Sequence, residues 1–236
     1  GMVRSLRHAV VLLVLSKTAA LVPRTTPRVS HRTGSPSMLA PPLRRVAVVG
    51  AGIGGLALAR ALYTLDTGVE EVVVFERRDE IKPNIGGGIQ INGGAAVLAR
   101  LGLGEQMKAS ALPVRRILSR KSGGFELLDI DVESLVLGEP TLVDDSGTPQ
   151  AFSIMRDALQ RMLADALPAG TLKLGRRLNS ICEDDAGVDL LFDDGASERF
   201  DLVVGADGLS SRVRAHVDAS HTDGDGDAGM AGGGAP

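Results

Sequence analysis

The 236-residue sequence has few aromatic residues, since it contains no Trp, one Tyr and five Phe. Proteins that hold single-stranded nucleic acid stack the bases on aromatic side chains. This composition therefore argues against nucleic-acid binding. Cys182 is the only cysteine, which excludes an internal disulfide and any metal site built from cysteines. Three aspartates, at 223, 225 and 227, have the spacing that opens a calcium loop, but Ala228 replaces the glycine that the loop requires. We expect no metal site.

Acidic residues are absent before Asp66, although the first 43 residues carry six Arg and Lys residues. Basic residues precede a short apolar run, 9–15, and a stretch rich in Arg, Ser, Thr and Pro follows at 23–43. The run is too short to cross a bilayer, which takes about 20 residues. A signal-like core followed by a transit-like stretch is typical of import into complex plastids. We predict a leader without regular structure over 1–43 and a plastid location, with a mitochondrial or secretory leader as the alternative.

The 44% hydrophobic content is enough for a buried core, and residues 44–76 have a βαβ pattern. An apolar run at 46–49 is followed by a glycine cluster, a helix expected over 53–65 and a second apolar run at 72–75. The cluster fits G-x-G-x-x-G at Gly50, Gly52 and Gly55. The first glycine permits a tight turn, the second lets a pyrophosphate approach, and the third lets the helix pack on the strand. The pattern predicts a dinucleotide-binding loop.

Glu76 ends the second run, 21 positions after Gly55, where a carboxylate accepts hydrogen bonds from the adenosine ribose. A carboxylate there repels a 2′-phosphate, so this site favours FAD or NAD over NADP. The alternative is a glycine-rich turn beside a surface glutamate.

The rest of the sequence predicts further helices and strands, and its pattern changes to short strand-like runs within 113–150. A second glycine cluster, at 86–94, precedes a helix expected over 95–101, and short strands are expected within 113–150, at 114–119, 125–130 and 140–143. A helix is expected after Ser153, then a β-meander of three strands at 178–182, 188–192 and 199–204, and a short helix to about Val217. Residues 218–236 lack large apolar side chains except Met230, which is typical of disorder.

Five stretches carry a family resemblance: GAGIGG, Glu76-Arg77, GGGIQINGGAAVLARLGL, SIMRDALQRML and DLVVGADGLSSRVR. Over residues 44–217 the chain resembles class A FAD-dependent monooxygenases, of the aromatic hydroxylase and zeaxanthin epoxidase kinds. The resemblance implies an α/β fold: a Rossmann-like FAD-binding domain (44–112 and 151–217) with a parallel sheet and a β-meander, and a partial β-rich substrate domain (113–150).

The same resemblance implies the cofactor contacts of particular residues. It places Asp207 and Gly208 near the FAD pyrophosphate, Arg156 on FAD from a helix start, and Arg77 beside the adenosine. The GGGIQI segment would pass close to the flavin. An Asp-Gly turn and a solvated helix arginine are the structural alternatives for Asp207 and Arg156.

In function, the resemblance implies NAD(P)H-dependent hydroxylation or epoxidation of an organic substrate by O₂ through a flavin C4a-hydroperoxide. A plastid address would suit a small, lipophilic substrate such as a carotenoid. The family has a further Gly-Asp motif beyond the GADG segment, which this sequence lacks. We therefore expect a truncated chain and leave open whether it is active or inactive. No catalytic residue is identified, and membrane association and oligomeric state are left open. A non-catalytic FAD-fold protein, like the Rab GDP-dissociation inhibitors, and an NAD-dependent dehydrogenase are the alternatives.

Overall fold

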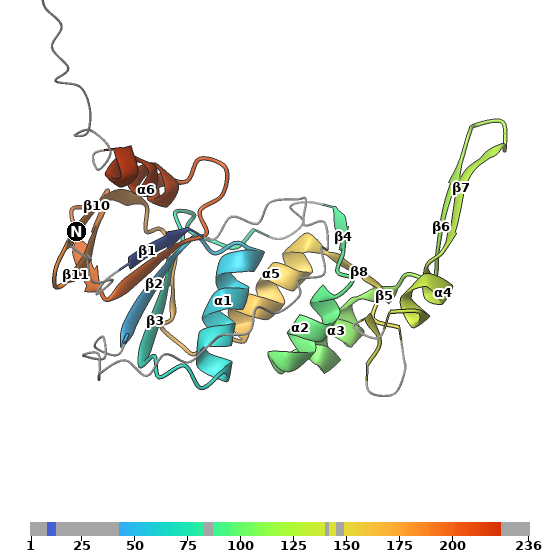
Figure 1. The fold of residues 1–236 in the computed structure, drawn as a ribbon, viewed down its shortest axis with the longest axis horizontal. Coiled ribbons are helices and arrows are strands. Elements are labelled where there is room, and N and C mark those ends of the chain that lie inside the picture. The colour runs from blue at the N-terminus through green and yellow to red at the C-terminus, as the bar shows by residue number, and fades with distance from the viewer. Residues whose placement is uncertain (1–8, 13–42, 83–86, 140–141, 145–148, 223–236) are drawn as a thin grey trace, which may run out of the picture.

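A five-stranded parallel sheet organises the chain in the computed structural model, which describes residues 9–12, 43–82, 87–139, 142–144 and 149–222 (Figure 1). Its strand order is β1-β13-β2-β3-β9. The strands are β1 (Ala9–Leu12), β2 (Arg45–Val49), β3 (Glu71–Phe75), β9 (Leu172–Lys173) and β13 (Leu202–Gly205). The predicted βαβ unit is therefore present, with α1 (Ile53–Thr64) joining β2 to β3.

Successive residues of the central strands enter two separate cores, because side chains alternate across a strand. Val48, Val72 and Val74 face helices α1 and α5 (Arg156–Asp165). Their neighbours Ala47, Val49, Val73 and Phe75 face a second layer made of strands. Both faces of the sheet are covered, which explains why β2 and β3 read as continuous apolar runs rather than alternating ones.

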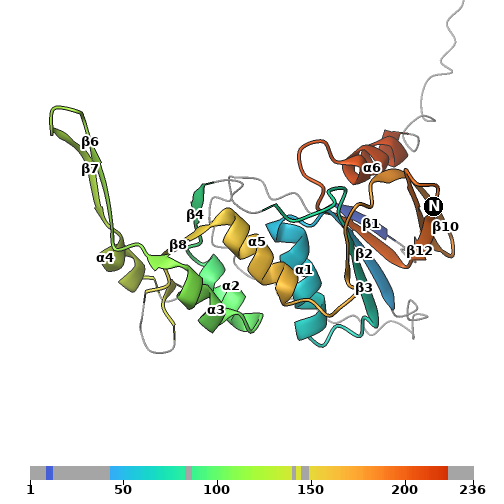
Figure 2. The same ribbon diagram turned by 180° about the vertical axis from the view of Figure 1, so that it is seen from behind.

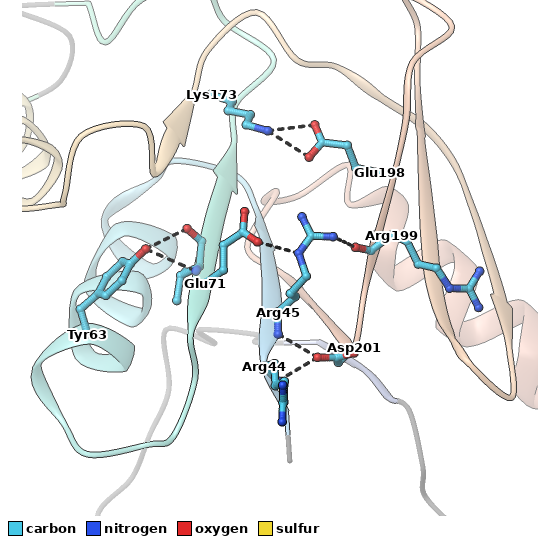
Figure 3. A network of polar contacts seen from close by, with 9 residues as sticks. Arg44, Arg45, Tyr63, Glu71, Lys173, Glu198, Arg199 and Asp201 are labelled. Carbon is cyan, nitrogen blue, oxygen red and sulfur yellow. Dashed lines mark hydrogen bonds and ion pairs between the residues drawn. The ribbon is translucent and has the colours of Figure 1, made fainter. Parts of the chain in front are cut away.

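The second layer is an antiparallel meander of β10 (Leu178–Asp184), β11 (Gly187–Phe192) and β12 (Ser197–Phe200). The prediction of one strand over 199–204 was wrong, because β12 pairs with β11 whereas β13 pairs in parallel with β2. Asp201 lies between them, and its carboxylate accepts hydrogen bonds from the backbone N–H groups of Arg44 and Arg45, both at 2.8 Å (Figure 3). This contact fixes the point where the chain passes from one sheet to the other.

Residues 88–155 form the other end of the molecule. Strands β4 (Gly88–Gln90), β8 (Phe152–Met155) and β5 (Leu112–Pro113) make a small sheet beside α2 (Gly94–Arg100) and α3 (Gly104–Ser110). A hairpin of β6 (Arg116–Arg120) and β7 (Glu126–Asp131) projects away from the body, and α4 (Val132–Leu137) lies at its base (Figures 1 and 2). The strands expected at 114–119 and 125–130 are this hairpin.

Two terminal segments differ from the sequence-based expectation. Ala9–Leu12, assigned above to a leader without regular structure, forms β1 along the outer edge of β13, where free backbone groups accept an apolar β-prone segment. Helix α6 (Arg212–Thr222) extends beyond Val217 into the part expected to be disordered. The rest of the expected tail, 223–236, and most of the leader lie outside the described residues. No helix among the described residues has the length and apolar character to span a membrane.

Candidate cofactor site

The loop at 50–55 connects β2 to α1 at the carboxyl edge of the parallel sheet, where ligands bind in this kind of fold. Backbone hydrogen bonds hold the loop to its neighbours: Gly50 N–H donates to the Phe75 carbonyl at 2.7 Å, and Ala206 N–H donates to the Val49 carbonyl at 2.7 Å. Gln160 on α5 adds a third attachment, donating from Nε2 to the Ala51 carbonyl at 2.6 Å. The loop is therefore fixed from three sides.

The three glycines of the loop have different roles. Gly50 has φ +109°, and a Cβ there would lie 2.4 Å from the Ala206 carbonyl oxygen. A Cβ on Gly55 would lie 2.0 Å from the Gly50 carbonyl oxygen, so this glycine permits the packing of α1 on the loop. A Cβ on Gly52 would meet no atom within 4 Å. The space in front of Gly52 is therefore open, as a backbone cradle for a ligand requires.

Helix α1 begins at this open space. Its N-cap is Gly52, no side chain caps its first turn, and that turn contains no acidic residue. The first N–H groups of a helix have no partner within the helix and carry a partial positive charge, which attracts a phosphate. The start of α1 is thus free to receive one.

Glu76 follows β3 and lies beside the loop. Its Oε2 accepts a hydrogen bond from Ala51 N–H at 3.0 Å, and its Oε1 accepts one from Arg78 N–H at 3.1 Å. Each carboxylate oxygen has a second acceptor position, so Glu76 can still accept from ribose hydroxyls. The two backbone contacts hold the carboxylate at the position expected from the sequence.

A cavity of about 550 Å³ joins these features, a volume within the range of small-molecule sites. Six arginines line it together with two acids, Glu76 and Asp207. Two of the arginines, Arg176 and Arg177, are paired with carboxylates outside the cavity lining. The other four are Arg77, Arg78, Arg156 and Arg212. These four positive charges and the two negative charges of the acids leave a net charge of about +2. The diphosphate of a dinucleotide carries one negative charge on each phosphate, so the net charge of the lining is complementary to it.

Arg156 occupies the start of α5, as the sequence suggested, and it borders both this cavity and an adjoining hollow of about 300 Å³. Its backbone N–H donates to the Gly87 carbonyl at 3.3 Å, which brings the GGGIQI segment to the cavity edge. Gln160 lies one turn further along the same helix and borders the same hollow. The i, i+4 spacing of Arg156 and Gln160 was the signal in the sequence that could have identified Gln160.

Asp207 lines the cavity, but its carboxylate points to the start of α6. Oδ1 accepts from the Ser211 hydroxyl at 2.5 Å, and Oδ2 accepts from the backbone N–H groups of Arg212 at 2.7 Å and Val213 at 3.4 Å. Asp207 and Ser211, whose hydroxyl accepts from Arg214 N–H at 2.9 Å, therefore occupy the first N–H groups of α6. Gly208 beside it has φ +83° and open space around its Cβ position. The anion-binding helix terminus at this site is consequently that of α1.

Ten lining residues were not among the predicted site residues: Val49, Phe75, Arg78, Arg176, Arg177, Leu178, Ala206, Leu209, Ser210 and Arg212. Arg78 adjoins the predicted Arg77, and Arg212 lies in the same stretch as Asp207, so both could have been included. The segment 176–178 comes from the loop between β9 and β10, about 100 positions after Glu76, and no motif marks it. Among the described residues, no group of three or more His, Cys, Asp or Glu side chains is arranged to hold a metal ion.

The residues present fit FAD. The open backbone at Gly52, the uncapped start of α1, the fixed carboxylate of Glu76 and the charge of the cavity match a phosphate-bridged adenosine cofactor. Gly52 and α1 would hold the diphosphate, Glu76 the ribose, and the arginines the phosphate charge.

Comparison with known proteins supports this fit. The sequence model of the family described as FAD binding domain matches residues 44–232. The chain is 37% identical over 175 residues to 3-amino-4-hydroxybenzoate 2-monooxygenase PtmB3 of Streptomyces platensis, covering 73% of this chain and 41% of the relative. It is 35% identical over 172 residues to an FAD-dependent urate hydroxylase of Klebsiella pneumoniae, covering 72% and 42%.

A solved structure of an FAD complex has a similar fold. Klebsiella pneumoniae HpxO in complex with FAD and uric acid superposes with a TM-score of 0.62 at 31% identity, over 73% of this chain and 41% of that one. The chain spans about two fifths of the length of these relatives. The predicted Rossmann-like fold with a parallel sheet and a meander is confirmed, and so is the FAD cofactor. The chain belongs to the FAD-binding domain family of the class A flavin-dependent monooxygenases.

Proposed function

We propose that this chain provides the adenosine and diphosphate site of an NAD(P)H-dependent flavin monooxygenase. The observation that carries the proposal is the cavity, whose lining contains the open backbone of Gly52 and four arginines with no carboxylate partner among the described residues. FAD bound there would supply the redox chemistry, taking two electrons from a reduced nicotinamide donor and using O₂ to oxygenate the substrate. The protein's own part at this site is to bind the diphosphate, orient the ribose through Glu76 and hold α1 against the loop.

The substrate class that we propose is a small molecule with a planar ring. The names of relatives mention 3-amino-4-hydroxybenzoate, 6-hydroxynicotinate and urate, which are planar compounds that carry oxygen on the ring. A lipophilic substrate, expected above from a plastid address, is the competing case. Both belong in one panel of test compounds.

The experiment begins with cofactor binding, since it tests the part of the site that the structure describes. The purified chain is incubated with FAD, desalted and examined for flavin absorbance, with a Glu76→Ala variant as the control. We expect stoichiometric flavin in the wild type and a reduced amount in the variant. A colourless protein after this treatment would contradict the proposal and favour a non-catalytic role for the fold.

The second stage tests oxygenation. Oxidation of NADH and of NADPH is followed with oxygen uptake in the presence of each ring compound and of a carotenoid, and hydroxylated product is sought by mass spectrometry. Product from a ring compound supports the proposed class. Product from the carotenoid alone would move the substrate to the lipophilic case.

We further propose that residues 1–43 direct the protein to a plastid. The support is compositional: the segment is basic, free of acids and contains one short apolar run. Fusion of this segment to a fluorescent protein, expressed in cells with complex plastids, should give a plastid signal. A mitochondrial or secretory signal would assign one of the other leaders instead.

A further inference from the structure

Arg176 lies in the wall of the cavity, next to the segment that carries Glu76. Its backbone N–H donates to the Glu76 carbonyl at 2.8 Å, and Gly175 N–H donates to the Arg78 carbonyl at 2.8 Å. The segment 175–177 is therefore joined directly to the segment that carries Glu76. Since Glu76 is the ribose-binding residue, Arg176 borders the end of the cavity where the adenosine would lie.

The guanidinium of Arg176 lies over a buried aromatic ring. Its central carbon lies 4.5 Å from the centroid of the Phe192 ring, within cation–π distance. Phe192 is buried and does not line the cavity, whereas Arg176 does, so the arginine separates the ring from the cavity. The guanidinium therefore has only the face turned away from Phe192 available to a ligand in the cavity.

The edges of the same guanidinium are occupied by acidic partners. Nη1 forms an ion pair with Asp194, Nη2 lies 3.5 Å from Glu198, and Nε is buried with no hydrogen-bond partner in the described structure. Glu198 is itself held by Lys173, which contacts both of its carboxylate oxygens at 3.0 and 2.9 Å (Figure 3). These contacts restrain rotation of the Arg176 plane and neutralise its charge. Arg176 is thus poorly suited to attract phosphate and well suited to present a flat face.

We infer that Arg176 is the platform on which the adenine ring of FAD stacks. Guanidinium planes stack on nucleobases through the same planar contact that they make with aromatic side chains. Phe192 supports the platform from below, and Asp194 and Glu198 fix its edges. The inference rests on the FAD-binding site proposed above and adds to it the recognition of the base.

The test uses two probes that separate the base from the phosphates. ADP and inorganic pyrophosphate are titrated by calorimetry into the full chain, and ADP binding is also followed by the loss of adenine absorbance near 260 nm that stacking produces. The chain has no Trp and one Tyr, so its own ultraviolet absorbance is low. The variant is Arg176→Lys, which keeps the charge and removes the plane. The control is Arg199→Lys, since Arg199 forms ion pairs with Asp184 and Asp189 on the meander and does not line the cavity.

For Arg176→Lys we expect ADP to bind roughly 5- to 150-fold more weakly, by the usual contribution of one stacked base. Pyrophosphate should bind as in the wild type, and the absorbance change on adding ADP should shrink. Arg199→Lys should match the wild type with both probes. Equal weakening of both probes by Arg176→Lys would assign the residue to phosphate binding and overturn the platform, and unchanged ADP binding would overturn it too. If the wild type binds neither probe, the FAD site itself fails, which is a separate outcome.

Discussion

Gly52 and Gly55 belong to one glycine motif, the first as the N-cap of α1 and the second within its first turn, and the structure predicts opposite consequences for the same substitution at the two positions. In Gly52→Ala the new methyl group enters open space, since no atom lies within 4 Å of its position. The backbone at Gly52 has φ −71° and ψ 173°, which any residue adopts. The protein should therefore fold, at a cost of about 1 kcal/mol or less for replacing glycine by alanine at a helix N-cap.

Gly55→Ala places its methyl 2.0 Å from a backbone carbonyl oxygen and 3.1 Å from the Ala206 Cβ. Neither neighbour can rotate away, so α1 must shift from β2, and overpacking of this severity costs about 3 kcal/mol. In a domain of this size that loss corresponds to a decrease in Tm of roughly 6–12 °C. The same rule gives Gly52→Ala a decrease of at most about 4 °C.

The assay combines thermal unfolding of the FAD-free proteins with FAD titration. The methyl group of Gly52→Ala occupies the space of the diphosphate, so we expect FAD affinity to fall by about tenfold or more, which is about 1.4 kcal/mol. Gly55→Ala should lose stability first, whether or not FAD is present. Wild-type FAD affinity in Gly52→Ala would refute the placement of the diphosphate at this loop. Equal losses of stability in both variants would refute the contrast between open and closed space.

Three further predictions concern contacts around the site and the sheet. Asp207→Ala removes two backbone hydrogen bonds from the first turn of α6, where Ser211 still accepts from Arg214 N–H, and should lower stability by about 1 kcal/mol, seen as a lower Tm. A loss of FAD affinity with unchanged Tm would instead make Asp207 a ligand. Gln160→Ala removes the 2.6 Å contact with the Ala51 carbonyl and should weaken FAD binding severalfold, by about 1 kcal/mol, with Arg161→Ala on the same helix as the control. The hydrogen bond from Arg45 lowers the pKa of the half-exposed Glu71 in the folded protein. The pair therefore stabilises the fold at pH values above the pKa of Glu71 in the unfolded chain, which is about 4.3. This stabilisation is lost as the pH falls through the lower pKa of the folded state. Stability measured from pH 6 to pH 3 should therefore fall more steeply in the wild type than in Glu71→Gln, by at most about 1 kcal/mol, and parallel curves would contradict this assignment.

The sequence predicted an element correctly where its local hydrophobic pattern matches the burial of that element in the fold. Strands β2 and β3 were recognised as apolar runs because both of their faces are buried. The run at 199–204 shows the limit of that reasoning. It is one β-prone stretch in the sequence, yet the contacts of Asp201 with the backbone of residues 44 and 45 divide it between two sheets. Those partners lie more than 150 positions away, and a local pattern carries no information about them.

The candidate site divides in the same way. Gly50, Gly52, Gly55 and Glu76 could be proposed from the sequence because the βαβ unit places them together within one short segment. Arg176 was missed, although it borders the same cavity, because the pairing of β9 with β3 brings it there.

The charges of the cavity explain why a search for basic residues would not have resolved the site either. The arginine pairs 77–78 and 176–177 look alike in the sequence, but they have different surroundings in the fold. The first pair forms no ion pair with described residues, whereas Asp193, Asp194 and Glu198 on the meander neutralise the second. The charges of the first pair are therefore available to a phosphate group. The charge of Arg176 is compensated, so only the face of its guanidinium is available for a ligand contact. The meander, which contributes neither acid of the cavity lining, thus determines which of the lining arginines keep an unpaired charge toward the proposed diphosphate site.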